Sequence, residues 1–139
     1  MDKLNTELQH PRDQIVEIIT RIYRAGLTTT SGGNVSIKDD EGNIWITPAA
    51  VDKGTLHRKD IICMGPDGEQ KGGFHRPSSE YPFHRAIYEV RPDLTAIVHA
   101  HPPALVSFAT VRQAPSMNIS PQARKVCGAI GYARYACPG

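Results

Sequence analysis

Cysteine is scarce in this chain, and its few cysteines form no recognisable pairs. Cys63, Cys127 and Cys137 are odd in number, lie far apart in the 139 residues and include no CxxC motif. Small secreted domains that depend on disulfides carry even sets of cysteines, whereas cytosolic proteins keep their thiols reduced. The sequence therefore argues against a disulfide framework and predicts free thiols.

Long apolar runs and concentrated charge are absent as well. No stretch approaches the roughly 20 apolar residues that a membrane-spanning helix needs, and the start, MDKLNTELQH, contains no apolar signal core. The formal net charge is +2, from 16 basic and 14 acidic residues interspersed along the chain. No basic run indicates a nucleic-acid or membrane partner. We expect a cytoplasmic protein. Binding of a small anionic ligand remains compatible with this charge.

What the sequence does contain fits one globular domain. The chain is 40% hydrophobic and 22% charged, which suits a single core and is too short for two ordinary domains. Pro11 is expected to open a helix that carries an isoleucine stripe and ends at Gly26. Strands are expected at 35–37, 44–47 and 61–64, the last turning at 65–68, with a loop at 71–76, a helix after Pro102 and a strand from Val126 to Ile130. Hairpins flanked by helices predict an α/β layered domain.

The stretch from residue 77 to residue 101, PSSEYPFHRAIYEVRPDLTAIVHAH, carries the strongest chemical signal. Its second half is an apolar run that ends in His99 and His101. Alternate side chains of a strand share a face, so these two imidazoles should point the same way about 7 Å apart. They can then converge on one metal ion; the competing interpretation is two surface histidines on a polar face.

The first half of this stretch predicts a helix that faces the strand. Ser79 is a suitable N-cap, Glu80 takes the first helical position, and Pro92 ends the helix after Arg91. A short connection then returns the chain antiparallel, so the histidines come back near Glu80. Two histidines and a carboxylate suit zinc best, with manganese or iron as lesser options. His84 lies on the apolar side of the helix, where we expect it to pack or to bond a neighbour.

Two further segments can hold an anion. The small polar and glycine residues at 28–34, TTTSGGN, expose backbone amides that can form an anion-binding nest, or else they are a plain turn. Ser78 and Ser79 either cap the helix or present two hydroxyls to a phosphate at its N-terminus. No role is assigned to the remaining histidines, which are His10, His57 and His75.

Several of these motifs, in this order, resemble the class II aldolase and adducin family, and within it the L-fuculose-phosphate aldolases most closely. They are SGGNVS at 31–36, ITP at 46–48, PSSE at 77–80, His84, RPD at 91–93 and VHAHP at 98–102. The resemblance implies an α/β fold with a central, mainly antiparallel sheet between helical layers, and a cytoplasmic homotetramer. It also implies a lyase that uses zinc to cleave a ketose 1-phosphate to dihydroxyacetone phosphate and an aldehyde.

The resemblance also implies roles for individual residues. Those that match His99 and His101 bind zinc, about one ion per chain, and the one that matches Glu80 is both a metal ligand and the catalytic acid or base. As a Lewis acid, zinc lowers the barrier to cleaving a bond beside a carbonyl. Glu80 is the candidate in this stretch for moving the proton. The substrate phosphate is held by the residues that match Gly33, Asn34, Ser78 and Ser79.

The chain departs from the family pattern in places. The family's third zinc histidine lies beyond the matched part, so residues 1–139 are expected to be one domain that lacks its C-terminal part. Ala49 and Ala50 stand where the fuculose-phosphate aldolases have Thr-Gly. No tyrosine between Phe108 and Gly131 matches the proton donor of those aldolases, and ISPQA at 119–123 is more similar to the adducin branch.

Alternative functions stay open on the sequence alone. The same scaffold and metal can support a decarboxylase or an epimerase. A non-catalytic, adducin-like interaction domain would keep the fold without the chemistry, and a fragment would never assemble the site. Glu80, His99 and His101 together favour an enzyme, because a cluster of ionisable groups is costly to keep without a task.

Overall fold

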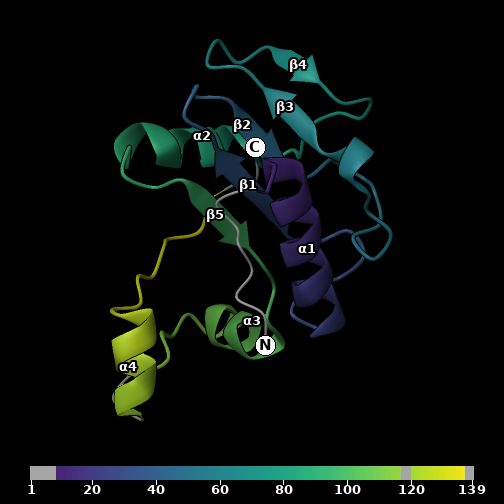
Figure 1. The fold of residues 1–139 in the computed structure, drawn as a ribbon. Helices are drawn as coiled ribbons and strands as arrows, with labels where there is room; N and C mark the ends of the chain where they lie inside the picture. Colours follow the sequence, from purple (N-terminus) through teal and green to yellow (C-terminus); the bar gives the residue numbers. More distant parts are fainter. Residues whose placement is uncertain (1–8, 117–119, 137–139) are drawn as a thin grey trace.

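Helices cover both faces of a five-stranded antiparallel sheet, as predicted (Figure 1). The computed structural model describes residues 9–116 and 120–136. The strand order is β4-β3-β2-β1-β5, and each neighbouring pair is antiparallel. The elements are α1 (Pro11–Arg24), β1 (Asn34–Lys38), β2 (Ile44–Ile46), the 3-10 helix η2 (Arg58–Asp60), β3 (Ile62–Met64), β4 (Gln70–Gly72), α2 (Tyr81–Val90), β5 (Ala96–His99), α3 (Pro103–Thr110) and α4 (Pro121–Cys127).

Helix α1 covers one face of the sheet, because its isoleucines recur at helical spacing. His10 caps the helix by accepting a backbone N–H of the first turn at 3.2 Å, and Pro11 takes the first helical position. The predicted stop is confirmed, since Gly26 adopts a φ of 67° just past the last turn. The core on this face consists of Ile15, Ile19, Val35, Leu56 and Ile61.

Helix α2 covers the opposite face and begins one residue later than predicted. Glu80 is the N-cap residue, Tyr81 is the first helical residue, and no side chain caps the helix. The expected Ser79 cap is wrong because the chain forms a turn at this point, in which Ser78 accepts the N–H of Glu80 at 3.3 Å. Tyr81 and Tyr88 of α2 pack with Ile44, Ile46, Ile62 and Met64 of the sheet.

The pairing of β1 with β5 sets the geometry of the site. Asn34 lies opposite His99, and Ser36 lies opposite Ile97. Alternate residues of a strand share a face, so Val35 joins the α1 core while Asn34 and Ser36 face α2. His99 therefore emerges on the α2 face, beside Asn34 and below the start of the helix.

The strand predicted from Val126 to Ile130 is wrong, because α4 extends through Cys127 and residues 128–130 form neither helix nor strand. The Ser120 hydroxyl accepts the N–H of Ala123 at 3.4 Å, and Gly128 adopts a φ of 64° after the last turn. A short apolar run fits a helix as well as a strand. The cap at Ser120 and the stop at Gly128 therefore decide that this segment forms a helix. Of the segment 119–123 that resembles the adducin branch, residue 119 lies outside the described residues.

The remaining expectations concern the second hairpin, the later helices and the thiols. The hairpin is confirmed, but β4 extends into the predicted loop at 71–76 because its residues pair with β3.

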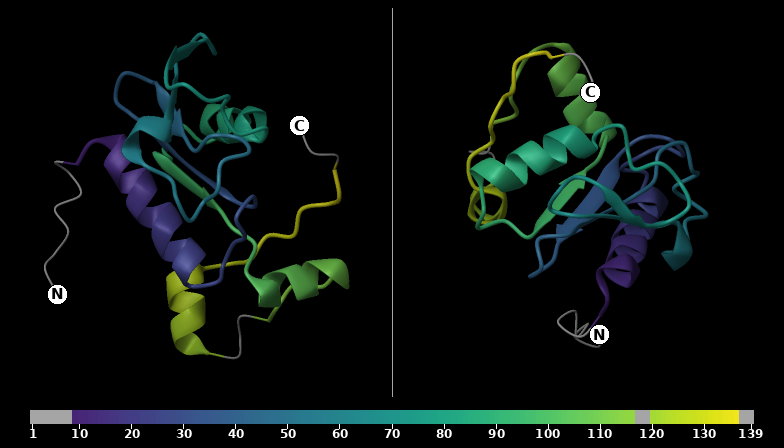
Figure 2. Two further views of the ribbon diagram at one scale, coloured as in Figure 1. Left: turned by 90° about the vertical axis from the view of Figure 1, so that its right-hand side faces the viewer. Right: turned by 90° about the horizontal axis from the view of Figure 1, so that it is seen from above.

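Helices α3 and α4 lie beyond the end of β5, away from the sheet faces that α1 and α2 cover (Figures 1 and 2). Cys63 is a buried free thiol, whereas Cys137 and the side chain of Cys127 lie outside the described structure. Among the described helices, none combines the length and the apolar character needed to cross a membrane.

Candidate active and metal site

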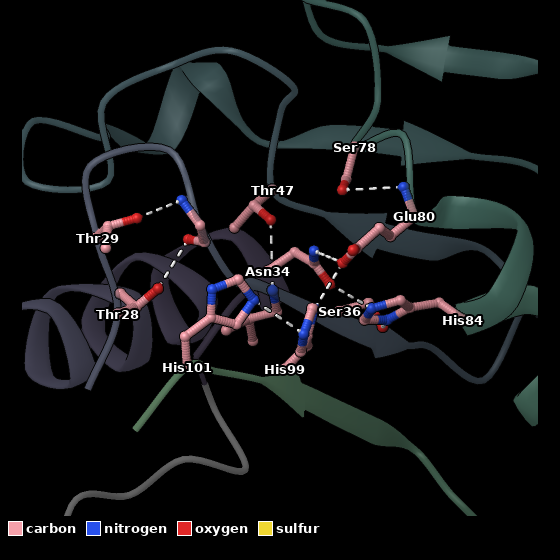
Figure 3. Close-up of polar contacts among 12 residues, drawn as sticks. Thr28, Thr29, Asn34, Ser36, Thr47, Ser78, Glu80, His84, His99 and His101 are labelled. Atoms are coloured by element: carbon pink, nitrogen blue, oxygen red, sulfur yellow. Dashed lines mark hydrogen bonds and ion pairs between the residues drawn. The ribbon is translucent and has the colours of Figure 1, made fainter. Parts of the chain in front are cut away.

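The three side chains predicted as metal ligands lie next to one another, at the start of α2 and the end of β5 (Figure 3). A carboxylate oxygen of Glu80 lies 2.5 Å from Nδ1 of His99. On the other side of the same ring, Nε2 of His99 lies 3.2 Å from Nε2 of His101. The carboxylate and both rings are thus on one side of the sheet, although all of α2 separates them in the sequence.

His101 lies just past the end of the strand. It contacts the segment that leads into β1, residues 27–33, which is called the glycine-rich loop below. Strand β5 ends at His99, so the HxH motif is only half in the strand. The backbone N–H of His101 donates to the carbonyl of Leu27 at 2.8 Å. A Cβ at Gly32 would lie 2.8 Å from Nδ1 of His101. The loop therefore packs directly against the ring, and a larger residue at position 32 would displace it.

The two imidazoles suit one tetrahedral metal ion. With metal–nitrogen bonds of 2.0–2.1 Å, two nitrogens on a tetrahedral zinc lie about 3.3 Å apart, close to the 3.2 Å between the Nε2 atoms of His99 and His101. Glu80 accepts the Nδ1 proton of His99, which leaves the Nε2 lone pair of that ring for a metal. A carboxylate in this position orients a histidine ligand.

Glu80 does not complete a three-ligand shell in this arrangement. Within the described part of the chain, no three side chains of the ligating types surround a common point. The reason is that Glu80 and His101 lie on opposite nitrogens of His99. The donor types, two imidazoles and a carboxylate, nevertheless fit zinc.

A cavity of 180 Å³ adjoins this cluster and collects the residues predicted to bind phosphate. Ser78 is buried and its hydroxyl accepts the N–H of Glu80, whereas Ser79 is exposed at the cavity. Gly33 adopts a φ of 68°, and a Cβ there would lie 2.8 Å from the carbonyl oxygen of His99. The described lining consists of Ser31, Gly32, Gly33, Asn34, Pro48, Ala49, Ala50, Lys53, Ser78, Ser79, Glu80 and His101.

Glu80 is held as a carboxylate. Burial on its own raises the pKa of Glu80, but the hydrogen bonds from Asn34 and His99 and the charges of His99 and His101 outweigh it, so the pKa lies below its usual range. The Asn34 amide donates directly to Glu80. The group is therefore deprotonated near neutral pH, the state that a general base requires.

A buried chain of hydrogen bonds supports Glu80 from below (Figure 3). The Asn34 carbonyl oxygen lies 2.5 Å from Nε2 of His84, Nδ1 of His84 lies 2.7 Å from the Ser36 hydroxyl, and that hydroxyl lies 2.9 Å from the Tyr88 hydroxyl. Asn34 donates to Glu80 through its nitrogen, so its oxygen faces His84 and Nε2 of His84 must donate. Nδ1 then accepts from Ser36, which fixes His84 as the neutral Nε2–H tautomer.

His84 is neutral for a clear physical reason. It is fully buried, and burial together with the nearby charge of His99 lowers its pKa to about 4, against the opposing charge of Glu80. The prediction that His84 bonds a neighbour is confirmed. Ser36 and Tyr88 could not be predicted as its partners, because a serine in a strand is typical of a polar face.

Lys53 lines the cavity although no motif marks it in the sequence. The remaining histidines have structural partners away from the cavity. His10 caps α1, His57 caps η2, and Nε2 of His75 lies 3.1 Å from Asp60.

The comparison with protein families agrees with this arrangement. Residues 13–139 match the family described as the Class II Aldolase and Adducin N-terminal domain. The chain belongs to the class II aldolase and adducin family.

Named relatives of this class II aldolase family member are sugar-phosphate aldolases. A 5-deoxy-D-ribulose 1-phosphate aldolase of Bacillus thuringiensis serovar kurstaki is 33% identical over 105 residues, which are 75% of this chain and 49% of the relative. An L-fuculose phosphate aldolase of Methanocaldococcus jannaschii is 32% identical over 124 residues, or 89% of this chain and 66% of the relative.

A solved structure has the same fold. An L-fuculose 1-phosphate aldolase superposes with a TM-score of 0.69 at 31% identity, covering 74% of this chain and 49% of that one. The chain thus spans between half and two thirds of the length of these relatives.

Proposed function

We propose that the protein is a zinc-dependent class II aldolase that cleaves a ketose 1-phosphate similar to L-fuculose 1-phosphate into dihydroxyacetone phosphate and an aldehyde. The supporting observation is the contact of the Glu80 carboxylate with the paired imidazoles of His99 and His101 beside a polar cavity. The names of the aldolase relatives favour a sugar phosphate as the substrate class.

Zinc would be held by His99 and His101, with Glu80 as the third protein group of the site. The bound metal supplies Lewis-acid stabilisation for the negative charge that develops when the bond beside a carbonyl breaks. The Asn34 amide donates to the Glu80 carboxylate and holds it next to His99.

Glu80 is the proposed catalytic acid and base. Its lowered pKa keeps it ionised, so it can accept a proton from the substrate hydroxyl and return one to the enediolate carbon. Such a group contributes about 100-fold or more to the rate.

The phosphate would lie in the adjoining cavity and orient the reacting carbons. Ser79 offers an exposed hydroxyl, Gly33 offers a backbone that closely approaches the cavity, and Asn34 retains a second amide proton after donating to Glu80. Ser78 shapes the turn through its bond to the Glu80 N–H. Binding energy gathered at the phosphate can then be used at the reacting bond.

We further propose a cytoplasmic homotetramer. Helix α3 has no buried residue and exposes the apolar side chains of Leu105, Val106 and Phe108. An apolar helix face left open in this way is typical of a subunit contact.

The proposed function is tested by a cleavage assay on Glu80→Gln. The variant should lose turnover of L-fuculose 1-phosphate by about 100-fold or more, because an amide cannot carry the proton, while zinc stays largely bound. The matched control is Glu89→Gln on the same helix, which removes an exposed carboxylate that pairs with Arg85 and should leave turnover intact. Undiminished turnover in Glu80→Gln would show that Glu80 does not transfer the proton. A wild-type protein that binds zinc but has no lyase activity would favour a decarboxylase or an epimerase.

A further inference from the structure

A buried lysine stands in the wall of the cavity. Lys53 lies in the loop between β2 and η2, and only 2% of its surface is exposed. Its Nζ donates to the backbone carbonyls of Pro48 at 3.1 Å and Val51 at 3.2 Å. Its backbone N–H donates to the carbonyl of Thr30 at 2.9 Å. This bond joins the loop that carries Lys53 to the glycine-rich loop, and both loops line the cavity.

The ammonium of Lys53 has more protons than partners. An ammonium carries three N–H donors, and the carbonyls of Pro48 and Val51 take two of them. The adjacent acid, Asp52, uses its carboxylate to accept the N–H of Gly54 at 2.8 Å. Among the described residues, none has a carboxylate bonded to Nζ of Lys53. A buried cation without a bonded counter-charge gains strongly from an anion.

The described lining residues that shortly precede Lys53 in the chain offer no side-chain donor. Ala49 and Ala50 line the cavity beside Lys53 and present only methyl groups. Ala50 adopts a φ of 55°, a left-handed conformation that disfavours alanine, so the loop is held in this shape by its bonds rather than by its own preference. Of the described cavity-lining residues, Lys53 is the single lysine or arginine.

We propose that Lys53 is the cationic contact of this cavity and the residue that makes it select a phosphate monoester over the uncharged analogue. This inference deepens the proposed aldolase function and rests on it for the identity of the ligand. A phosphate oxygen takes the third ammonium proton, while the Ser79 hydroxyl and the amides near Gly33 contact the other oxygens. A lysine serves this purpose as a compact charge that needs no fixed bidentate geometry.

The test is calorimetric titration of the purified protein with inorganic phosphate. Lys53→Met keeps the length of the side chain and removes the charge, so the dissociation constant for phosphate should rise about tenfold or more, since a hydrogen bond from a charged group is lost. Lys71→Met on β4 removes an exposed lysine and is the matched control, with an unchanged dissociation constant. Equal affinities of Lys53→Met and the wild type overturn the proposal, as does a wild type that binds no phosphate.

A purely structural role gives a different result. If Lys53 only fastens the loop, Lys53→Met lowers the unfolding midpoint and leaves the preference for phosphorylated over unphosphorylated sugar unchanged, which overturns the proposal. A second measurement needs no folded methionine variant: carbon-13 NMR of lysine-labelled wild-type protein should show the buried Lys53 signal shifting as phosphate is added. Absence of that shift contradicts the proposed contact.

The outcomes separate this inference from the proposed function. Phosphate affinity is measured without turnover, so a Lys53-dependent affinity in a protein that cleaves no sugar phosphate refutes the aldolase and keeps the anion site. If the protein cleaves a sugar phosphate and Lys53→Met leaves phosphate affinity unchanged, the aldolase function stands and only the role of Lys53 is refuted.

Discussion

At the scale of single residues, His84 is a buried group whose protonation the fold resists. It is enclosed between Ser36 and Asn34, and its Nε2 proton is required to hold the oxygen of Asn34. A second proton on the ring would have to point at the Ser36 hydroxyl, which donates there in the neutral state. The folded protein therefore binds this proton less readily than the unfolded chain does.

This difference predicts an acid-sensitive stability. The pKa of His84 falls from 6.5 to about 4 on folding, so its stabilising contribution is complete above pH 6.5 and is lost as the pH falls towards 4. The loss amounts to at most about 3 kcal/mol. Urea unfolding of the wild type between pH 7 and pH 4.5 should show this decline, and His84→Gln should have a flatter profile.

The matched control is Tyr88→Phe at the far end of the same network. It removes one hydroxyl of the buried pair with Ser36 and introduces no group that titrates in this range. Its free energy of unfolding should fall by about 1 kcal/mol at every pH. Identical pH profiles for the wild type and His84→Gln would show that His84 is not the titrating group.

At the scale of elements, the glycine-rich loop and β5 fit together through two glycines with different neighbours. A Cβ at Gly33 would meet the backbone oxygen of His99 at 2.8 Å, and its φ of 68° is unfavourable for other residues. A Cβ at Gly32 would meet the ring of His101, which can move. The first glycine therefore supports the strand pairing, and the second supports the placement of a ligand.

Two alanine substitutions should separate these effects. Gly33→Ala should lower the free energy of unfolding by about 1–2 kcal/mol from its left-handed backbone alone, and further from the clash with β5. Gly32→Ala should change stability little and weaken zinc binding by displacing His101. Gly131→Ala, where a Cβ meets nothing within 4 Å, is the control. Equal losses of stability in Gly32→Ala and Gly33→Ala would contradict the separate roles given to these two glycines.

Local patterns predicted the elements that carry the site, and tertiary contacts decided the rest. The apolar run that ends at His99 and the spacing of Tyr81, His84 and Tyr88 indicate a strand and a helix without help from distant residues. The role of Lys53 could not be predicted, because its burial depends on the closure of one loop over another through the bond to Thr30. The prediction of a strand near Val126 was wrong because the apolar run is too short to distinguish the periodicity of a strand from that of a helix.

At the scale of the whole molecule, the sheet keeps an open edge next to the proposed site. Strand β5 is an edge strand in the order β4-β3-β2-β1-β5, and Val98 on it is 54% exposed. Helix α3 follows β5 in the chain and exposes Leu105, Val106 and Phe108. The proposed homotetramer would cover these exposed side chains, which places subunit contacts close to His99 and His101.

The most direct test of the account is the zinc content of the protein after reconstitution and desalting, measured by inductively coupled plasma mass spectrometry. We predict about one zinc ion per chain in the wild type, loss of that zinc in His99→Asn, and retention in the control His75→Asn, whose ring contacts Asp60 instead. A wild-type protein that retains no zinc would contradict the shared metal site and favour a non-catalytic interaction domain.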